Sequence, residues 1–493
     1  MNLKKINTNN LFNSILVIFL LIQPIFDLKI FYNSISTLIR VVIIFSLFAY
    51  YFFTSNNKKK YLIFVYPCLL IIYFIFHHIN ALNFNSLVPG NFNYSIIKES
   101  LYFIKMLSPF LLIYSIYKSN LEKKELLKII KILVCVIGLT IIISNTFVFS
   151  YGSYSDEPIK ASFISWFSQN DFVYQDLASK GLFEYANQIS AILLMFLPFC
   201  LSAFLHNKKT YNLLVLIINI FSLFLLGTKV SVLGIFLVFA YTIFVFVFNH
   251  KFIFKQKTSY LAIVSTVIIL ISYSLIVSYN PIFMRIDETK TIEASSDSVV
   301  TEEIVETNNS SSDITIQNPT DSISFIAQNY TNKQIKSEFI TQSYPYEYDS
   351  EFWLKIFNEP LSNRVDYRFM ELSMIKRVVE INNNKFDKYL GITNTRIQNI
   401  FNIERDFVVQ YYALGIIGLI LIFLPYICLL IWYVYVTLKN KLKSLTVENL
   451  LAFISILMAF GISYFSGNLL NSLSFTIYFA LLIDLLLDKN SSA

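Results

Sequence analysis

The chain has 493 residues, of which 55% are hydrophobic and only 14% are charged, and its formal net charge at pH 7 is +7. Soluble domains carry about 25% charged residues, so this composition excludes a soluble globular protein and indicates a multi-pass membrane protein. The lysines lie in small groups between apolar runs and not in one basic stripe with interleaved aromatic residues, so no nucleic-acid partner is expected.

The apolar segments predict an all-α polytopic membrane protein. A helix needs roughly 17 or more apolar residues to cross a bilayer, and about twelve such segments occur, nine within residues 1–279 and three within residues 407–493. A large external loop, residues 280–406, is predicted between spans 9 and 10. The predicted spans are 11–27, 35–53, 61–79, 100–117, 127–149, 183–205, 211–227, 230–248, 260–279, 407–436, 447–465 and 469–487.

The loop lysines predict the orientation in the membrane. Cytoplasmic loops carry an excess of Lys and Arg, and lysine-rich loops alternate here with lysine-poor ones. Both termini are therefore predicted to be cytoplasmic and the 280–406 loop to be external. The lysine-rich loops contain residues 4–5, 58–60, 118–131, 208–209, 251–257, 439–443 and 489, whereas the short external loops contain the single lysines Lys29, Lys98, Lys160, Lys180 and Lys229.

The external loop divides into two parts. Residues 287–330 are rich in acidic residues, Ser, Thr and Asn and show no apolar periodicity, so a disordered acidic insertion is predicted. This insertion is either a spacer or charged brush at the cell surface, or a loop expansion that the fold tolerates. Residues 335–406 are predicted to be partly helical and to form a site.

A helix is predicted over residues 361–380, where two arginines lie one turn apart. Like charges at this spacing destabilise an isolated helix slightly, so Arg364 and Arg368 suggest a shared anion; the alternative is that they are solvated or paired with Asp366 and Glu371. The apolar stripe of this helix consists of Val365, Phe369, Leu372, Ile375 and Val379.

Further cations lie in or near the predicted spans. Gly227 and Thr228 predict a tight external turn that places Lys229 at the outer membrane surface, either as a lysine that snorkels to the interface or as a third cation of an anion site. Arg40 and Lys105 lie inside predicted spans, where a charge is costly unless it faces a polar interior.

The segment that re-enters the membrane begins with three consecutive charges. Residues 404–406 (Glu-Arg-Asp) run directly into the uncharged segment 407–436. Successive helical residues fan out by about 100°, so at least one of the three faces water, lipid headgroups or a polar cavity. Gly415 and Gly418 are predicted to let another helix approach closely.

The common cofactor and metal motifs do not occur. The sequence has no glycine-rich phosphate loop and no HExxH, so neither a cofactor nor a metal is expected, and the adjacent His77 and His78 are predicted to be interfacial. The external face instead offers cations and carboxylates, which suit the binding of a pyrophosphate and the movement of a hydroxyl proton.

Together these features resemble the O-antigen ligase and O-antigen polymerase superfamily. The family's return motif begins with histidine, asparagine and an acidic residue and ends in Gly-x-x-Gly. Alignment on the two glycines places Glu404, Arg405 and Asp406 at the first three positions. The family's external turn carries Ser-Arg where Thr228 and Lys229 stand.

The resemblance implies a metal-independent glycosyltransferase at the outer face of a bacterial plasma membrane. Such enzymes transfer an oligosaccharide from undecaprenyl pyrophosphate to an acceptor glycan or lipid carrier, in the synthesis of capsule, O-antigen or a similar polysaccharide. Glu404 or Asp406 would act on the acceptor hydroxyl. The implied pyrophosphate-binding residues are Lys229, Arg364, Arg368 and Arg405.

Several alternatives stay open. A polymerase is slightly favoured over a ligase, and the competing class is a flippase or other transporter of lipid-linked sugars. A transporter of this size often shows an internal repeat, which this sequence lacks. Membrane lipids and other polysaccharide-assembly proteins are further candidate partners.

The orientation is testable with topology reporters. Fusions near Lys58, Lys124, Lys208, Lys255 and Lys441 should report a cytoplasmic location and one near Ser310 an external location, because of the loop lysine bias. Protease accessibility in intact cells and in inverted vesicles gives an independent measurement. A cytoplasmic signal at Ser310 would overturn the predicted orientation.

Overall fold

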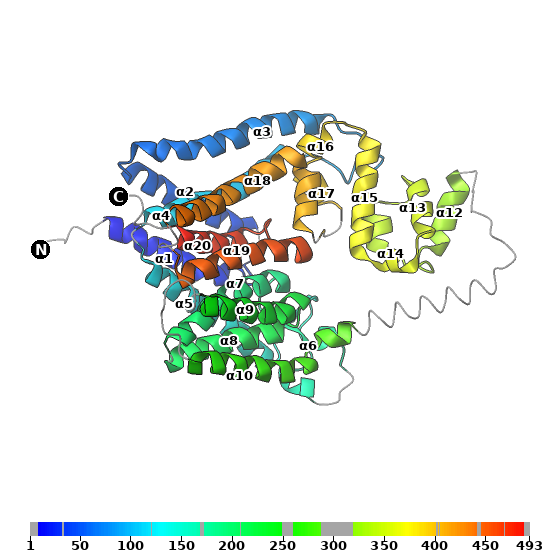
Figure 1. Cartoon of the computed structure of the whole chain (residues 1–493). Coiled ribbons are helices and arrows are strands. Elements are labelled where there is room, and N and C mark those ends of the chain that lie inside the picture. The colour runs from blue at the N-terminus through cyan, green and yellow to red at the C-terminus, as the bar shows by residue number, and fades with distance from the viewer. Residues whose placement is uncertain are drawn as a thin grey trace, which may run out of the picture. The chain divides into compact units, whose positions relative to one another are not determined.

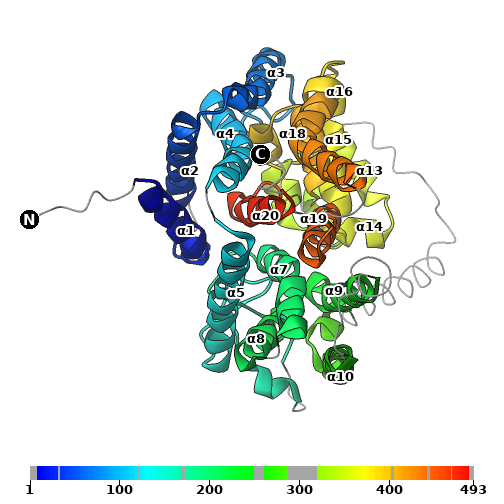
Figure 2. The same cartoon turned by 60° about the vertical axis from the view of Figure 1, so that its left-hand side comes forward.

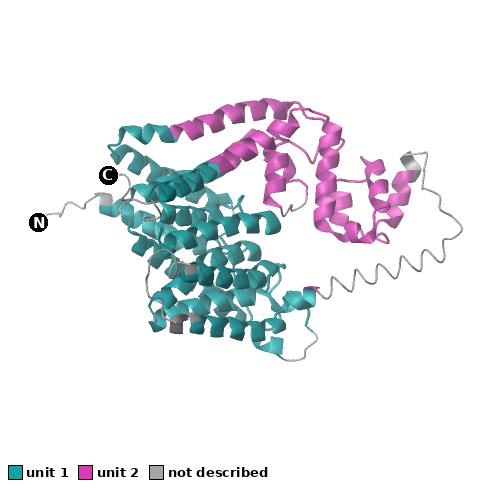
Figure 3. Cartoon of the chain, viewed as in Figure 1, with its two compact units in different colours: residues 1–63, 104–285, 425–493 teal, residues 64–103, 286–424 magenta. Residues whose placement is uncertain are grey.

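The computed structural model describes most of the chain as two compact units. The described residues are 8–31, 34–119, 121–167, 172–207, 209–248, 260–286, 319–400, 403, 405–440, 445–467 and 469–487. Unit 1 comprises Met1–Ile63, Ile104–Arg285 and Pro425–Ala493, and unit 2 comprises Phe64–Phe103 and Ile286–Leu424 (Figure 3).

The described elements are almost all helices (Figures 1 and 2). The long ones are α1 (Thr8–Phe26), α2 (Ser34–Thr54), α3 (Val65–Leu82), α4 (Ile96–Lys118), α5 (Lys123–Thr146), α7 (Ala186–His206), α8 (Thr210–Leu226), α9 (Lys229–Phe248), α10 (Tyr260–Ile276), α18 (Asp406–Lys439), α19 (Val447–Ser466) and α20 (Leu473–Leu486). The connecting segments contain β1 (Tyr151–Gly152), η2 (Phe163–Phe167), α6 (Tyr174–Leu177), β2 (Ser179–Gly181), η4 (Val277–Tyr279), α12 (Pro319–Asn329), η5 (Glu338–Ser343), α13 (Ser350–Phe357), α14 (Leu361–Val365), α15 (Tyr367–Asn382), α16 (Asp387–Leu390) and α17 (Asn394–Ile397), and η1 (Lys58–Phe64) precedes α3.

The all-α membrane architecture is confirmed. Each predicted span coincides with one of the twelve long helices. By length and composition, seven of the described helices are apolar enough to cross a membrane, and four more are shorter apolar helices. The number of crossings therefore stays a prediction. Strands β1 and β2 form a small antiparallel pair.

Helix α7 lies at the centre of unit 1. Nearly all of its side chains are buried, and it packs against α5, α8, α9 and α19. Two glycines allow neighbouring helices to approach. A Cβ on Gly234 of α9 would lie 2.4 Å from a Leu194 side-chain atom on α7, and one on Gly138 of α5 would lie 2.4 Å from Ile218 on α8. Small residues at helix contacts are typical of membrane bundles.

The charge of Arg40 is neutralised inside unit 1. Its side chain is 1% exposed and forms an ion pair with Asp27, which is 2% exposed. Arg40 Nε also donates to Gln23 Oε1 at 2.9 Å, and Ser474 Oγ donates to the second Asp27 oxygen at 2.5 Å. Each charged group is therefore paired and hydrogen-bonded, as a buried charge requires.

Helix α18 is broken at Gly415, although we predicted one continuous helix over residues 407–436. Gly415 has φ 63° and ψ −175°, which frees backbone carbonyls of the preceding turn. The backbone N–H groups of Ile392 and Thr393 donate to the carbonyls of Tyr412 and Ala413 at 2.8 and 3.0 Å. These long-range bonds replace the helical ones that the break removes.

The two glycines of α18 allow the predicted close approach. A Cβ on Gly415 would lie 2.3 Å from the carbonyl carbon of Tyr389, which belongs to the short helix α16. A Cβ on Gly418 would lie 2.5 Å from the Tyr73 hydroxyl on α3. The hydroxyl of Tyr73 in turn donates to the carbonyl of Leu414.

Two predictions about the external loop are wrong. The predicted helix 361–380 is interrupted at Asp366, whose side chain caps α15 by accepting from Arg368 N at 2.9 Å. The buried face of α15 also differs from the predicted stripe, because it includes Met370, Met374 and Val378. Helix α12 occupies the end of the segment predicted as disordered, residues 287–330, and residues 287–318 lie outside the described part.

The break in α18 makes a prediction about stability. Gly415→Ala should destabilise the protein, because alanine is strained at this backbone conformation by about 1–3 kcal/mol and its Cβ would overlap the backbone of Tyr389. Gly461→Ala on α19 is the matched control, since a Cβ there meets nothing within 4 Å. Thermal unfolding of both detergent-solubilised variants measures the difference. Equal midpoints would show that the close contact at Gly415 contributes nothing.

Candidate functional site

Lys229 directly follows the turn between α8 and α9, and this turn contains a glycine in the left-handed backbone conformation. Gly227 ends α8 with φ 56°, as the predicted tight turn requires. A Cβ there would lie 3.1 Å from Ala178 Cβ. Strand β2, which begins at the next residue, therefore runs close to this turn.

Side chains from distant segments hold the end of α8. The last carbonyls of a helix have no partners within it. Here Ser153 Oγ donates to Leu226 O at 2.6 Å, Tyr174 Oη donates to Gly227 O at 2.9 Å, and Asn280 Nδ2 donates to Phe224 O at 2.7 Å. The donors come from the segment between α5 and α7 and from the segment after α10, so these two segments fix the turn.

Thr228 caps the next helix from a fully buried position. Its Oγ1 accepts from Ser231 N at 3.0 Å, and its own N–H donates to Ser231 Oγ at 3.1 Å. Ser190 Oγ on α7 lies 3.1 Å from Thr228 Oγ1. Reciprocal capping of this kind fixes the start of a helix. Lys229, the first residue of α9, is exposed. Its side chain therefore extends from a backbone whose position these hydrogen bonds fix.

Further charged residues, which we did not predict as site residues, lie on the same two segments of unit 1. Lys180 on β2 is 4% exposed. Its Nζ lies 3.5 Å from Asp156 Oδ1, and Lys29 Nζ lies 2.9 Å from the same oxygen. Burial lowers the pKa of Lys180, and the Asp156 carboxylate opposes that shift. The guanidinium of Arg285 stacks 4.2 Å from the centre of the Tyr154 ring.

The predicted catalytic segment enters α18 in unit 2. Asp406 is the first residue of α18 and is fully buried, whereas Arg405 is exposed. A carboxylate in the first turn is stabilised by the helix dipole. One turn along, Gln410 Oε1 accepts from Tyr102 Oη at 2.7 Å. Glu404 lies outside the described residues.

The structure separates Arg364 from Arg368 by the helix break at Asp366. Both arginines are half-buried. Arg364 Nη1 donates to the carbonyl of Lys333 at 3.0 Å, while Arg368 is the second residue of α15. They lie on two different helices and do not share one helix face as predicted, and a common anion between them stays a prediction.

A buried network in unit 2 holds the segment that follows α16. Glu99 accepts from the backbone N–H groups of Asn394 and Thr395, both at 2.9 Å, and from Thr395 Oγ1 at 2.6 Å. His77 Nε2 lies 3.1 Å from Glu99 Oε1, and its Nδ1 lies 2.6 Å from the carbonyl of Leu390. Both ring nitrogens of His77 therefore face oxygen atoms of other residues.

The side chain of His77 is fully buried in unit 2, and its place at the membrane interface stays a prediction. A hydrogen-bond partner more than 300 residues away leaves no local signal in the sequence. The adjacent His78 does lie nearer the surface, where its Nδ1 contacts the Tyr94 hydroxyl at 2.8 Å.

Arg396 closes the same network. It donates to the carbonyls of Ala81, Phe92 and Ile392 at 2.9, 2.9 and 3.2 Å, and it stacks 3.9 Å from the centre of the Phe84 ring. Burial lowers the pKa of Arg396 to about 10. Arg396 therefore has a structural role, because its hydrogen bonds connect the C-terminal end of α3 to the segment before α18.

The predicted site residues divide between the two units. Lys229 belongs to unit 1, and Arg364, Arg368, Arg405 and Asp406 belong to unit 2. Their convergence on one substrate stays a prediction. In unit 1 long-range hydrogen bonds fix the turn before Lys229, and in unit 2 they hold α18 at Gln410 and at the break near Gly415.

Comparison with known proteins identifies the family. A family model described as O-antigen ligase like membrane protein matches residues 9–490. No curated protein matches the chain. The match covers nearly the whole chain, including both units and every helix described above. The chain therefore belongs to the O-antigen ligase-like family of membrane proteins.

Proposed function

We propose that this protein is a glycosyltransferase that extends or transfers lipid-linked oligosaccharides at the outer face of a bacterial plasma membrane. The donor is an oligosaccharide on undecaprenyl pyrophosphate, and the product is a cell-surface polysaccharide. Membership of the O-antigen ligase-like family supports this role. Among the two acceptor types we favour a second lipid-linked repeat unit, which makes the protein a polymerase.

The observation that carries the proposal is the rigid, exposed placement of Lys229. Its backbone is fixed by the Gly227 turn, by the Thr228 cap and by side chains from two external segments. A cation at the start of a helix adds to the positive end of the helix dipole, and together they suit an anion such as pyrophosphate. Rigid donors stabilise developing charge without reorganisation.

The reaction requires one bond to form and one to break. The acceptor hydroxyl oxygen attacks the anomeric carbon of the donor sugar. The bond from that carbon to the pyrophosphate oxygen breaks, and its electron pair remains on the pyrophosphate. Lys229, Arg364, Arg368 and Arg405 are proposed to stabilise this charge.

The hydroxyl proton needs an acceptor. We propose that the carboxylate of Glu404 takes this proton, or orients the hydroxyl, at the position of the family's histidine. Asp406 is the second candidate. Its full burial at the start of α18 favours a role in which it orients its neighbours, whereas direct contact with a sugar would require the segment to move.

The role of Glu404 predicts a selective loss of turnover. Glu404→Gln keeps the size of the side chain but removes the base, so the rate of glycosidic bond formation should fall by roughly 10²-fold or more while the donor still binds. Purified protein and a synthetic lipid-linked donor provide the measurement. Glu347 is an exposed glutamate of the same loop, and the control variant Glu347→Gln should leave the rate unchanged. A normal rate for Glu404→Gln would transfer the assignment to Asp406.

The cations predict a different pattern. Lys229→Ala and Arg364→Ala should each weaken donor binding and lower the rate, because the pyrophosphate is negatively charged before and during the reaction. Lys229→Arg should keep most of the activity, since the charge is preserved. Lys160→Ala and Lys355→Ala remove exposed lysines of the same segments and serve as controls. If donor binding is unchanged in both test variants, the proposed pyrophosphate site is wrong.

A further inference from the structure

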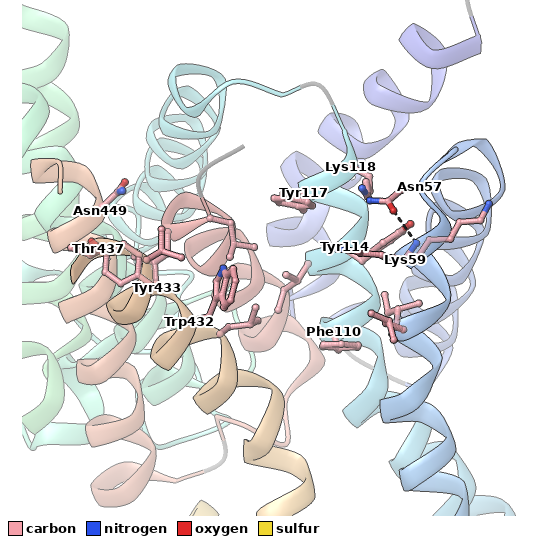
Figure 4. A pocket seen from close by; sticks show the side chains of 18 residues that line it. Asn57, Lys59, Phe110, Tyr114, Tyr117, Lys118, Trp432, Tyr433, Thr437 and Asn449 are labelled. Atoms are coloured by element: carbon pink, nitrogen blue, oxygen red, sulfur yellow. Dashed lines mark hydrogen bonds between the residues drawn. The ribbon is translucent and has the colours of Figure 1, made fainter. Parts of the chain in front are cut away.

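Unit 1 contains a cavity that the proposed reaction does not use. Its volume is about 500 Å³, within the range of small-molecule sites. Figure 4 shows aromatic side chains on both of its sides, with Trp432 and Tyr433 of α18 facing Tyr114 and Tyr117 of α4. The remaining walls come from the α2–η1 connection and from the ends of α19 and α20.

The lining of this cavity is apolar with a positively charged rim. It includes Lys59, Lys60 and Lys118, and no carboxylate occurs among the described residues that line it. Lys60 Nζ donates to the carbonyls of Phe52 and Ser55 at 2.9 and 2.8 Å, which leaves one of its three N–H groups for a ligand.

The other two rim lysines are also suited to an anion. Lys118 is the last residue of α4 and is half-buried. Its Nζ lies 5.9 and 5.5 Å from the centres of the Tyr114 and Tyr117 rings, so these rings limit where the ammonium can lie. Lys59 is exposed at the end of the cavity where Asn57 Oδ1 accepts from Lys59 N at 2.9 Å. Three lysines therefore line one edge of an otherwise apolar cavity.

The position of the cavity along the helices decides the class of ligand. The residues that line the cavity lie at or near helix ends that are predicted to be cytoplasmic from the loop lysines. Lys229, by contrast, lies at the N-terminal end of α9, which is predicted to be external. Tryptophan, tyrosine and lysine together are typical of the membrane interface. The cytoplasmic leaflet is also the one that anionic lipids make negatively charged.

We propose that this cavity is a binding site for an anionic phospholipid of the cytoplasmic leaflet. The phosphate lies between Lys59, Lys60 and Lys118. One acyl chain runs into the apolar part, along Phe110, Leu429 and Trp432. The lipid links η1 to the predicted cytoplasmic ends of α4, α18, α19 and α20, and it is distinct from the lipid-linked donor of the outer face.

Trp432 makes the proposal directly measurable. The chain has three tryptophans; Trp353 is 0% exposed and Trp166 is 7% exposed, whereas Trp432 is 58% exposed and lines the cavity. Phosphatidylglycerol with brominated acyl chains should quench Trp432 in full-length protein in mixed micelles. We expect half-maximal quenching at a concentration at least tenfold lower than for brominated phosphatidylcholine. Trp432→Phe should remove the quenched component.

Double lysine variants distinguish binding of the lipid in this cavity from general electrostatic attraction of an anionic lipid to the protein surface. The double variant Lys59→Gln/Lys118→Gln should lose most of the preference for phosphatidylglycerol, because a lysine near an anionic headgroup contributes roughly a fivefold effect. Lys59→Arg/Lys118→Arg should retain it. Lys58→Gln/Lys124→Gln removes the same charge from exposed positions of the same predicted side outside the cavity and should behave like the unaltered protein.

Three results would overturn the proposal. The first is equal quenching by the two lipids in the unaltered protein, and the second is a preference that survives Lys59→Gln/Lys118→Gln. The third is relief of quenching by free glycerol 3-phosphate at millimolar concentration, which would identify the ligand as a soluble phosphate. Size-exclusion profiles of the variants establish that each one is folded and monodisperse before these comparisons are made.

Discussion

Both parts of the candidate site depend on one requirement: the backbone carbonyls that are left without helical partners at helix ends and at the break in α18 must accept hydrogen bonds from elsewhere in the chain. A helix that ends in an apolar assembly leaves carbonyls that need donors, because no water is available to supply them. In unit 1 the donors to the end of α8 are Ser153, Tyr174 and Asn280. In unit 2 the carbonyls at the α18 break receive the N–H groups of Ile392 and Thr393.

The connecting segments of each unit also depend on polar side chains that supply hydrogen-bond partners. Charged and polar side chains such as Glu99 and Arg396 hold their partners through several hydrogen bonds each. Such networks specify one arrangement when every member is satisfied. Binding and catalysis require this kind of rigid placement, because a misplaced cation stabilises neither the bound pyrophosphate nor the transition state.

The sequence predicted what depends on local pattern. Apolar length located the long helices, glycine and threonine located the turn at Gly227, and small residues predicted the close approach at Gly415 and Gly418. It failed where long-range contacts decide. Nothing near Asp366 distinguishes a helical aspartate from the cap that interrupts 361–380, and nothing near His77 reveals its contact with the carbonyl of Leu390, 313 residues away. The charged residues Lys180 and Arg285 were missed for the same reason, since their partners are brought together only by the folded external segments.

The central claim is that the protein forms glycosidic bonds and does not merely move its substrate. Reconstituted protein supplied with a lipid-linked oligosaccharide tests this most directly, with new bonds and released undecaprenyl pyrophosphate counted in the same vesicles. Our account predicts one undecaprenyl pyrophosphate for every bond formed. Transfer of the intact lipid-linked donor from one leaflet to the other, with no pyrophosphate released, would contradict it and identify the protein as a transporter.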